Sequence, residues 1–285
     1  MTATPRKPFR LLAVDADGTL LDPEGSLRPR TRAALAEARR RGVEVVLCTG
    51  RRFRTAKPLL EELELEGPVV AQNGVVVKDG RTGQTIHHRY LAPELYPPAL
   101  ERMRRTHAPL VYIDAPETGT DMLCERPETW HPFQREYVEA NRDVVAYVDS
   151  LTAHPEHPVV MLSCMADRGS LEALAAGVHR EIGSRVHTHL IDNKLYQGSI
   201  LEILSPRANK WSALQDVARA RGIEADEILA IGDDDNDLPM IRNAGLGIAM
   251  GNATDSLQKA AGFVTQSHDD DGAARAIERF LLGAS

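Results

Sequence analysis

Short apolar runs that end abruptly in polar residues recur towards both ends of the chain. Leu11–Val14, Val43–Cys48 and Glu227–Ile231 are runs of this kind. An apolar run of this length between turn signals is typical of a strand buried on both faces, as in a parallel sheet. The segment Pro29–Arg41 predicts a helix, because Pro begins it and Gly42 follows it. A strand, a helix and a strand in that order predict two parallel strands joined by a right-handed connection.

The middle of the chain, residues 86–191, lacks this regular alternation. Short β stretches and helical stretches interleave there without long apolar runs, which favours a small α+β domain with an open, antiparallel-rich sheet. Beyond it the first pattern returns, beginning with an apolar strand at Ser199–Leu204. We therefore expect a doubly wound parallel-sheet (Rossmann-like) α/β core formed by residues 1–85 and 192–285, with an inserted α+β cap domain at 86–191.

Composition narrows the possible partners and compartments. A hydrophobic content of 42% with 26% charged residues is that of a soluble globular protein, and the net charge of −7 argues against nucleic acid as a partner. Cys48, Cys124 and Cys164 have no CxxC spacing, so they predict neither a disulfide framework nor a thiolate metal site and suit a reducing cytoplasm. No apolar run is long enough for a signal peptide or a membrane span. We expect a cytoplasmic monomer or small homo-oligomer.

The first apolar run leads directly into two carboxylates. Asp15 and Asp17 stand at its carboxyl end, and Gly18 lets the chain turn sharply. Ligands of open α/β sheets bind just outside the carboxyl ends of the strands. The alternative is that both acids are ordinary turn residues.

Two further positions offer groups that bind phosphate. Thr49 and Gly50 end the second strand, and a Thr hydroxyl with a backbone N–H supplies two donors. Lys210 lies in the first turn of a predicted helix, where a cation opposes the helix dipole. An unfavourable placement of this kind, with no nearby residue in the sequence to offset it, is more frequent at functional sites. Thr-Gly is also a common turn, however, and Lys210 could be a solvated lysine.

The most acidic stretch follows the strand Glu227–Ile231. Its residues are Asp233, Asp234, Asp235, Asn236 and Asp237. So many acids at the end of an apolar strand repel one another unless a cation lies among them. A set of oxygen ligands favours Mg²⁺ over zinc. The alternative is an acidic loop exposed to solvent.

These stretches together resemble the haloacid dehalogenase superfamily, and in particular its Cof-like phosphatase branch. The matching motifs, in chain order, are Asp-Ala-Asp-Gly-Thr-Leu-Leu at 15–21, Thr-Gly-Arg at 49–51, Asn-Gly at 73–74, a lysine at a helix start at 210, Gly-Asp-x-x-Asn-Asp at 232–237 and Gly-Asn-Ala at 251–253. Each is common alone, but their order and their places at strand ends or a helix start are specific. The resemblance covers the core and indicates only the type of cap.

The resemblance implies a role for each matching residue. Asp15 would be the nucleophile and Asp17 the general acid/base, while Thr49, Gly50, Lys210 and Asn236 would bind the phosphate. Mg²⁺ would be bound by Asp15, the backbone carbonyl of Asp17 and Asp233, with Asp237 in support. Asn73 is expected to be a turn residue first and a substrate-side residue second.

The predicted function is Mg²⁺-dependent hydrolysis of a small phosphorylated metabolite, such as a sugar phosphate, nucleotide or cofactor phosphate, through an aspartyl-phosphate. A phosphotransferase or phosphomutase would use the same residues, with a second substrate in place of water. A metabolite-binding regulator without turnover is the non-enzymatic alternative, which the full set of chemical residues disfavours. The histidine pairs at 87–88 and at His187 and His189 have no third ligand at motif spacing.

Overall fold

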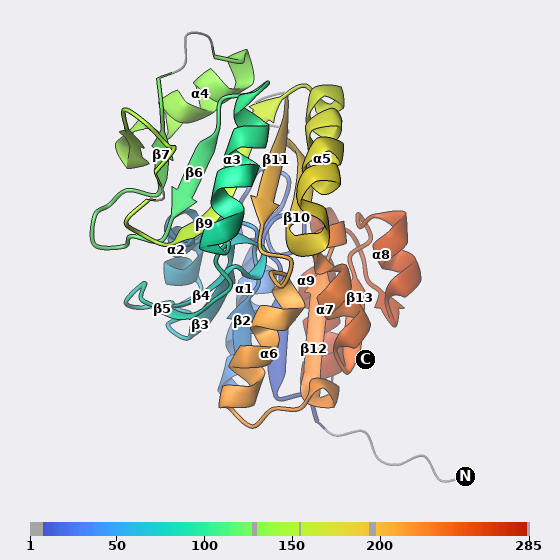
Figure 1. The fold of residues 1–285 in the computed structure, drawn as a ribbon. Coiled ribbons are helices and arrows are strands. Elements are labelled where there is room, and N and C mark those ends of the chain that lie inside the picture. Colours follow the sequence, from blue (N-terminus) through green and yellow to red (C-terminus); the bar gives the residue numbers. More distant parts are fainter. Residues whose placement is uncertain (1–7, 127–129, 154, 194–197, 284–285) are drawn as a thin grey trace. The chain divides into compact units, whose positions relative to one another are not determined.

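The computed structural model describes residues 8–126, 130–153, 155–193 and 198–283 (Figure 1). Contacts between Cα atoms divide the chain into two compact units. Unit 1 is Met1–His88 with Asn209–Ser285, and unit 2 is Arg89–Ala208. In the part of the chain that the structure describes, no helix is long and apolar enough to cross a membrane.

Unit 1 is built on a five-stranded parallel sheet in the order β14-β13-β12-β1-β2. Its strands are β1 (Leu11–Val14), β2 (Glu44–Leu47), β12 (Ile228–Gly232), β13 (Leu246–Ala249) and β14 (Phe263–Val264). The central strands β1 and β12 are buried along their whole length. Burial on both faces explains their continuous apolar sequences.

The helices of unit 1 cover both faces of this sheet. They are α1 (Pro29–Arg40), α2 (Phe53–Glu62), α6 (Lys210–Ala220), α7 (Leu238–Asn243), α8 (Asp255–Ala260) and α9 (Gly272–Ile277). Helix α1 joins β1 to β2, and α7 joins β12 to β13 in the opposite direction across the sheet. Right-handed connections that run in opposite directions place their helices on opposite faces. The doubly wound parallel core predicted from the sequence is confirmed.

A second, three-stranded antiparallel sheet belongs to unit 1. It consists of β3 (Pro68–Ala71), β4 (Val76–Asp79) and β5 (Thr85–His88). β3 connects to the large sheet through an isolated parallel bridge between Val70 and Cys48. Three consecutive residues after β3, Gln72–Gly74, have positive φ angles of 48°, 55° and 84°.

Unit 2 is a six-stranded, mostly antiparallel sheet with helices, in the order β10-β11-β9-β6-β7-β8. Its strands are β6 (Leu110–Ile113), β7 (Met122–Cys124), β8 (Val145–Tyr147), β9 (Val159–Ala166), β10 (His187–Asn193) and β11 (Gly198–Leu204), and its helices are α3 (Tyr96–Arg104), α4 (Pro132–Ala140) and α5 (Arg168–Ile182). Helices α3 and α5 lie side by side, and both pack on β9 (Figure 1). This confirms the α+β class of the second unit.

One strand was assigned to the wrong part of the chain. Ser199–Leu204 was expected to reopen the core after a cap ending at residue 191, but it lies in β11, which pairs antiparallel with both β9 and β10 of unit 2. Its central position buries both faces, so its apolar run looks like that of a parallel core strand. Unit 2 consequently extends to Ala208.

Each unit has its own apolar core, and a cysteine lies in or beside each. Cys48 is buried in unit 1, while Cys124 and Cys164 are buried in unit 2. All three are free thiols. Burial raises the pKa of each thiol, that of Cys124 to about 11.

Candidate active site

The first candidate residue, Asp15, directly continues strand β1. Its backbone N–H donates to the carbonyl of Ile231 on β12 at 3.1 Å, so the sheet ladder holds its backbone, and only 5% of the residue is exposed. Gly18 then turns the chain with a φ of +77°. A Cβ atom at Gly18 would lie 2.2 Å from Oδ2 of Asp233, so glycine is required for this close approach.

Lys210 reaches Asp15 from the first turn of α6. Its ammonium group donates to Oδ1 of Asp15 at 2.8 Å and to Oδ1 of Asp237 at 2.6 Å. The side chain of Lys210 is completely buried. The helix is capped independently by Asn209, whose Oδ1 accepts from the backbone N–H of Ser212 at 2.8 Å. A cation at this unfavourable end of the helix is therefore compensated by two carboxylates.

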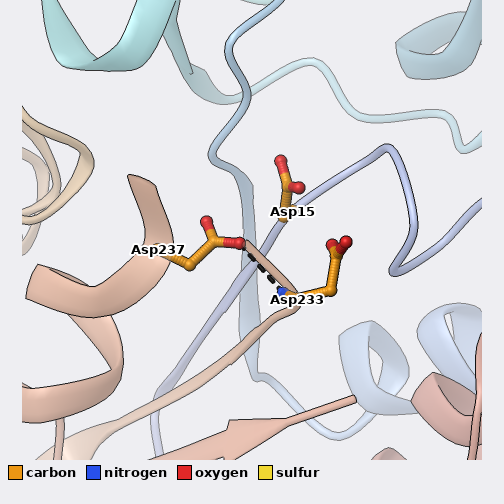
Figure 2. Close-up of side chains that lie close together, drawn as sticks. All are labelled: Asp15, Asp233 and Asp237. Carbon is orange, nitrogen blue, oxygen red and sulfur yellow. Dashed lines mark hydrogen bonds between the residues drawn. The ribbon is translucent and has the colours of Figure 1, made fainter. Parts of the chain in front are cut away.

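The acids predicted from two separate stretches form one cluster. Carboxylate oxygens of Asp15, Asp233 and Asp237 lie within 4.8 Å of one another. Figure 2 shows the three side chains close together: Asp15 and Asp233 directly follow β1 and β12, and Asp237 lies in the short helical turn after Asp233. The hydroxyl of Thr19 donates to Oδ1 of Asp233 at 2.7 Å, which fixes that carboxylate on the other side.

Asp237 is more constrained than the other two carboxylates. Its Oδ2 accepts from the backbone N–H of Asp233 at 3.0 Å, drawn as the dashed line in Figure 2, and from that of Asp234 at 3.2 Å. Its Oδ1 accepts from Lys210. Since both oxygens are already engaged, Asp237 shapes the acidic loop and orients Lys210.

The electrostatics of the cluster follow from burial. Desolvation raises the pKa of Asp15 well above its ordinary value, against the lowering by Lys210, and the nearby Asp237 and Asp233 raise it further. Desolvation likewise raises the pKa of Asp233 to about 7, although the Thr19 hydrogen bond acts in the opposite direction. Desolvation also opposes the charge on Lys210, but Asp15 and Asp237 outweigh it and raise its pKa above the usual value. The lysine alone therefore leaves excess negative charge in this site.

The cluster fits a small, hard divalent cation. Its donors are all oxygens, which suits Mg²⁺ rather than zinc. A cation would offset the desolvation and mutual repulsion that raise the pKa values of Asp15 and Asp233. Both oxygens of Asp237 accept hydrogen bonds, whereas among the described residues Asp15 and Asp233 each accept at Oδ1 and keep Oδ2 for a cation.

The predicted phosphate-binding residues line the same edge of the sheet. Thr49 is fully buried just after β2, and its backbone N–H donates to Val70 at 2.8 Å. Next to it, Gly50 leaves room for Asn73, whose Oδ1 would lie 3.0 Å from a Cβ at that glycine. Asn236 donates from Nδ2 to this same Oδ1 at 3.0 Å, while its own buried Oδ1 has no partner among the described residues. Asn73 thus links the loop after β2 with the acidic loop.

Two site contacts were missed by the sequence reasoning, those of Thr19 and Arg51. Arg51 donates two hydrogen bonds to the carboxylate of Asp17, from Nε to Oδ2 at 2.7 Å and from Nη2 to Oδ1 at 2.5 Å. The hydrogen bond with Asp17 raises the pKa of Arg51 further. Thr19 and Arg51 directly follow Gly18 and Gly50 in two of the motifs identified from the sequence. Their place in those motifs could have indicated that they belong to the site.

Comparison with known proteins gives a consistent family. The sequence profile of haloacid dehalogenase-like hydrolases matches residues 12–277. The chain is 30% identical over 302 residues to 5-amino-6-(5-phospho-D-ribitylamino)uracil phosphatase YwtE of Bacillus subtilis, covering 96% of this chain and 99% of that protein. It is 30% identical over 251 residues to the HMP-PP phosphatase of Cronobacter sakazakii, covering 87% and 86%.

A solved structure agrees over the whole chain. The haloacid dehalogenase-like hydrolase from Bacteroides thetaiotaomicron superposes with a TM-score of 0.79 at 26% identity, covering 95% of this chain and 99% of that one. The resemblance to the Cof-like branch stated from the motifs is thereby confirmed. With strand-end carboxylates, a buried lysine and a profile match that spans both units, the chain belongs to the haloacid dehalogenase-like hydrolases.

Proposed function

We propose that this protein is a Mg²⁺-dependent phosphatase that hydrolyses a small phosphorylated metabolite through an aspartyl-phosphate on Asp15. The observation that carries the proposal is the placement of Asp15: a carboxylate at the end of a buried strand, 2.8 Å from a buried lysine ammonium and within 4.8 Å of two further acids. A fixed carboxylate in a site built for cations suits nucleophilic attack on a phosphate monoester.

In the first step, a carboxylate oxygen of Asp15 forms a bond to phosphorus. The bond from phosphorus to the ester oxygen breaks, and its electron pair goes to that oxygen. Asp17 gives its proton to the same oxygen, so the product leaves as a neutral alcohol. The charge of Lys210 on Oδ1 favours the ionised form of the nucleophile and keeps it in one orientation, and a bound cation would add to this effect.

In the second step, water attacks the phosphorus of the aspartyl-phosphate. Asp17 takes a proton from this water, the bond between phosphorus and Asp15 breaks, and inorganic phosphate leaves. Mg²⁺, held by Asp15, Asp233 and the backbone carbonyl of Asp17, would screen the repulsion between the nucleophile and the phosphate dianion. Asp237 supports the site through Lys210 and the loop N–H groups.

The transferring oxygens need donors as charge develops on them. We assign this role to the Thr49 hydroxyl, the Gly50 backbone N–H, Lys210 and the amide of Asn236. Support comes from their common location at the carboxyl edge of the parallel sheet, on either side of Asp15. Thr49 still has a proton to donate, because its Oγ1 only accepts, from the backbone N–H of Arg51 at 3.1 Å.

The substrate class follows from the relatives. Their names specify 5-amino-6-(5-phospho-D-ribitylamino)uracil and HMP-PP. A screen of these two compounds, sugar phosphates, nucleotides and cofactor phosphates should identify the preferred substrate. We propose a cytoplasmic enzyme, a monomer or small homo-oligomer, that acts on neither nucleic acid nor a membrane.

Phosphate release from this panel tests the function. We expect release with Mg²⁺, none in excess chelator and recovery when Mg²⁺ is restored. Asp15→Ala should reduce release to background for every substrate, while the matched surface variant Asp216→Ala should not. Full activity in chelator would exclude the metal role, and activity in Asp15→Ala would exclude the nucleophile. Transfer of phosphate to an added alcohol in preference to water would indicate a phosphotransferase.

We further propose that unit 2 is a cap domain that selects substrates. It has its own apolar core and is inserted into unit 1. Replacing 89–208 by a short linker should leave a folded unit 1 with less discrimination among substrates. Replacing only 86–191 should leave β11 without its partner β9 and most of its partner β10, and expose an apolar strand. Circular dichroism and aggregation assays on the two deletions test this boundary.

A further inference from the structure

The exposed carboxylate of Asp17 is held by a single side chain. Arg51 donates to both of its oxygens in a parallel, fork-shaped contact at 2.7 and 2.5 Å. Within the described part of the chain, the Asp17 carboxylate has no other hydrogen-bond partner. The Asp17 side chain is 58% exposed, so packing alone does not fix its rotamer.

Arg51, by contrast, is anchored along its whole length. Its backbone N–H donates to the Thr49 hydroxyl at 3.1 Å, and its carbonyl accepts from the N–H of Gln72 at 3.0 Å. At the other end, Nη1 contacts the carbonyl of Thr55 in α2 at 3.5 Å. The position of the guanidinium is therefore restrained by the backbone of Arg51 on one side and by the first turn of α2 on the other.

We propose that Arg51 is the positioning residue for Asp17: it holds the general acid/base in the orientation from which a proton reaches the ester oxygen. The inference rests on the proposed function. Arg51 keeps one carboxylate oxygen of Asp17 through Nε, while the second oxygen is released for proton transfer when substrate binds. Small errors in the placement of a catalytic group are costly, so losing this contact lowers the rate more than it lowers the stability.

The dependence on the leaving group separates this role from that of a phosphate-binding residue. An alkyl phosphate needs a proton on its departing oxygen, whereas p-nitrophenyl phosphate releases a stable phenolate without one. A residue that places Asp17 must therefore matter most for alkyl substrates in the first step. A residue that binds the phosphate would matter equally for both, and would act on KM.

The experiment compares Arg51→Gln and Arg51→Lys with the wild type, using p-nitrophenyl phosphate and the fastest alkyl phosphate of the panel, both with Mg²⁺. The matched control is Arg41→Gln, at the end of α1 opposite to the site, where Arg41 also donates to a carboxylate at 2.7 Å. For Arg51→Gln we expect kcat on the alkyl phosphate to fall about 10- to 100-fold with little change in KM. With p-nitrophenyl phosphate, whose first step needs no proton, a rapid-quench time course of Arg51→Gln should show a burst of nitrophenol followed by slower turnover.

A double variant completes the test. Arg51→Gln should add nothing to Asp17→Asn, because the group it positions is already disabled. Arg51→Lys, which keeps the charge but loses the fork, should fall between the wild type and Arg51→Gln. An equal rise in KM for both substrates, multiplicative losses in the double variant, or rates matching Arg41→Gln would each overturn the inference. Failure of the proposed function is seen separately, as an inactive wild type or an active Asp15→Ala.

Discussion

Two groups of paired charges at the same edge of one sheet differ in their exposure to solvent and in their hydration. Lys210 with Asp15 and Asp237 is sealed, with exposed side-chain fractions of 0%, 7% and 0%. Arg51 with Asp17 is open to solvent, at 30% and 58%. The buried cluster exchanges hydration for fixed hydrogen bonds, whereas the open pair keeps much of its hydration.

The difference separates two requirements of the proposed chemistry. The nucleophile must stay ionised and immobile through the attack, and the buried lysine contributes to both, together with the proposed cation. The acid/base must gain and lose a proton in every turnover, so it needs solvent access and a contact that can loosen. The buried group therefore keeps its contacts throughout the reaction, whereas the exposed pair can change its contacts in each turnover.

The largest expected effect comes from removing the buried cation. Lys210→Met leaves Asp15 and Asp237 buried without their partner, and such losses cost about 3–5 kcal/mol. Phosphate release should fall to background at the same time. Urea unfolding and phosphate assays measure the two effects, with Lys57→Met on the exposed side of α2 as the control. A loss of stability no greater than that of the control would show that the cluster is not a fixed charge group.

The next effect concerns the loop between the two pairs. Gly18→Ala strains a φ of +77° and drives a Cβ into Asp233, whereas Gly25 has the same φ of +77° with nothing within 4 Å of a Cβ. Gly25→Ala should cost about 1 kcal/mol from strain alone, and Gly18→Ala more than about 2 kcal/mol. Gly18→Ala should also weaken Mg²⁺ binding, measured by calorimetry. Equal costs for the two variants would mean that the loop moves aside freely.

A third effect depends on pH. Asp233 has a folded pKa raised to about 7, above its ordinary value of 3.8. A raised carboxyl pKa means that metal-free stability is fully present at low pH and is lost as pH rises from about 4 to about 7. Mg²⁺ should restore it, so the gain in Tm on adding Mg²⁺ should be larger at pH 8 than at pH 5. Scanning calorimetry checks this; Asp233→Asn should remove most of the pH dependence, and an equal gain at both pH values would contradict it.

The smallest effect is expected at the open pair. Arg51→Gln should change the free energy of unfolding by less than about 1 kcal/mol despite the two short hydrogen bonds, because exposed ion pairs contribute little. Urea unfolding beside Arg41→Gln measures it. A loss comparable to that of Lys210→Met would erase the distinction between the two pairs.

The sequence was sufficient for the parallel core because its central strands combine an apolar run with acidic residues that follow directly. β1 and β12 are apolar throughout and end in acids, which predicts both the sheet and the edge where the acids meet. Asp15 and Asp233 were predicted on this basis, and Lys210 because a cation in the first turn of a helix is unfavourable; the structure places the three together.

Two features escaped prediction for different physical reasons. β11 was misplaced because a buried central strand has the same apolar run in an antiparallel sheet as in a parallel one. The partner of Asp17 was missed because pairing depends on where a long side chain reaches, and Arg51 is 34 residues away in sequence. Spacing along a chain carries no information about such a contact.

The three buried cysteines have a practical consequence. Alkylating reagents attack only the thiolate of an accessible cysteine, and burial suppresses both accessibility and ionisation in the folded state. Each thiol therefore becomes reactive only when its surroundings open. Cys48 reports on unit 1, and Cys124 and Cys164 report on unit 2. The alkylation rate of each cysteine, measured by mass spectrometry, would therefore report how fast its own unit opens, independently of the other unit.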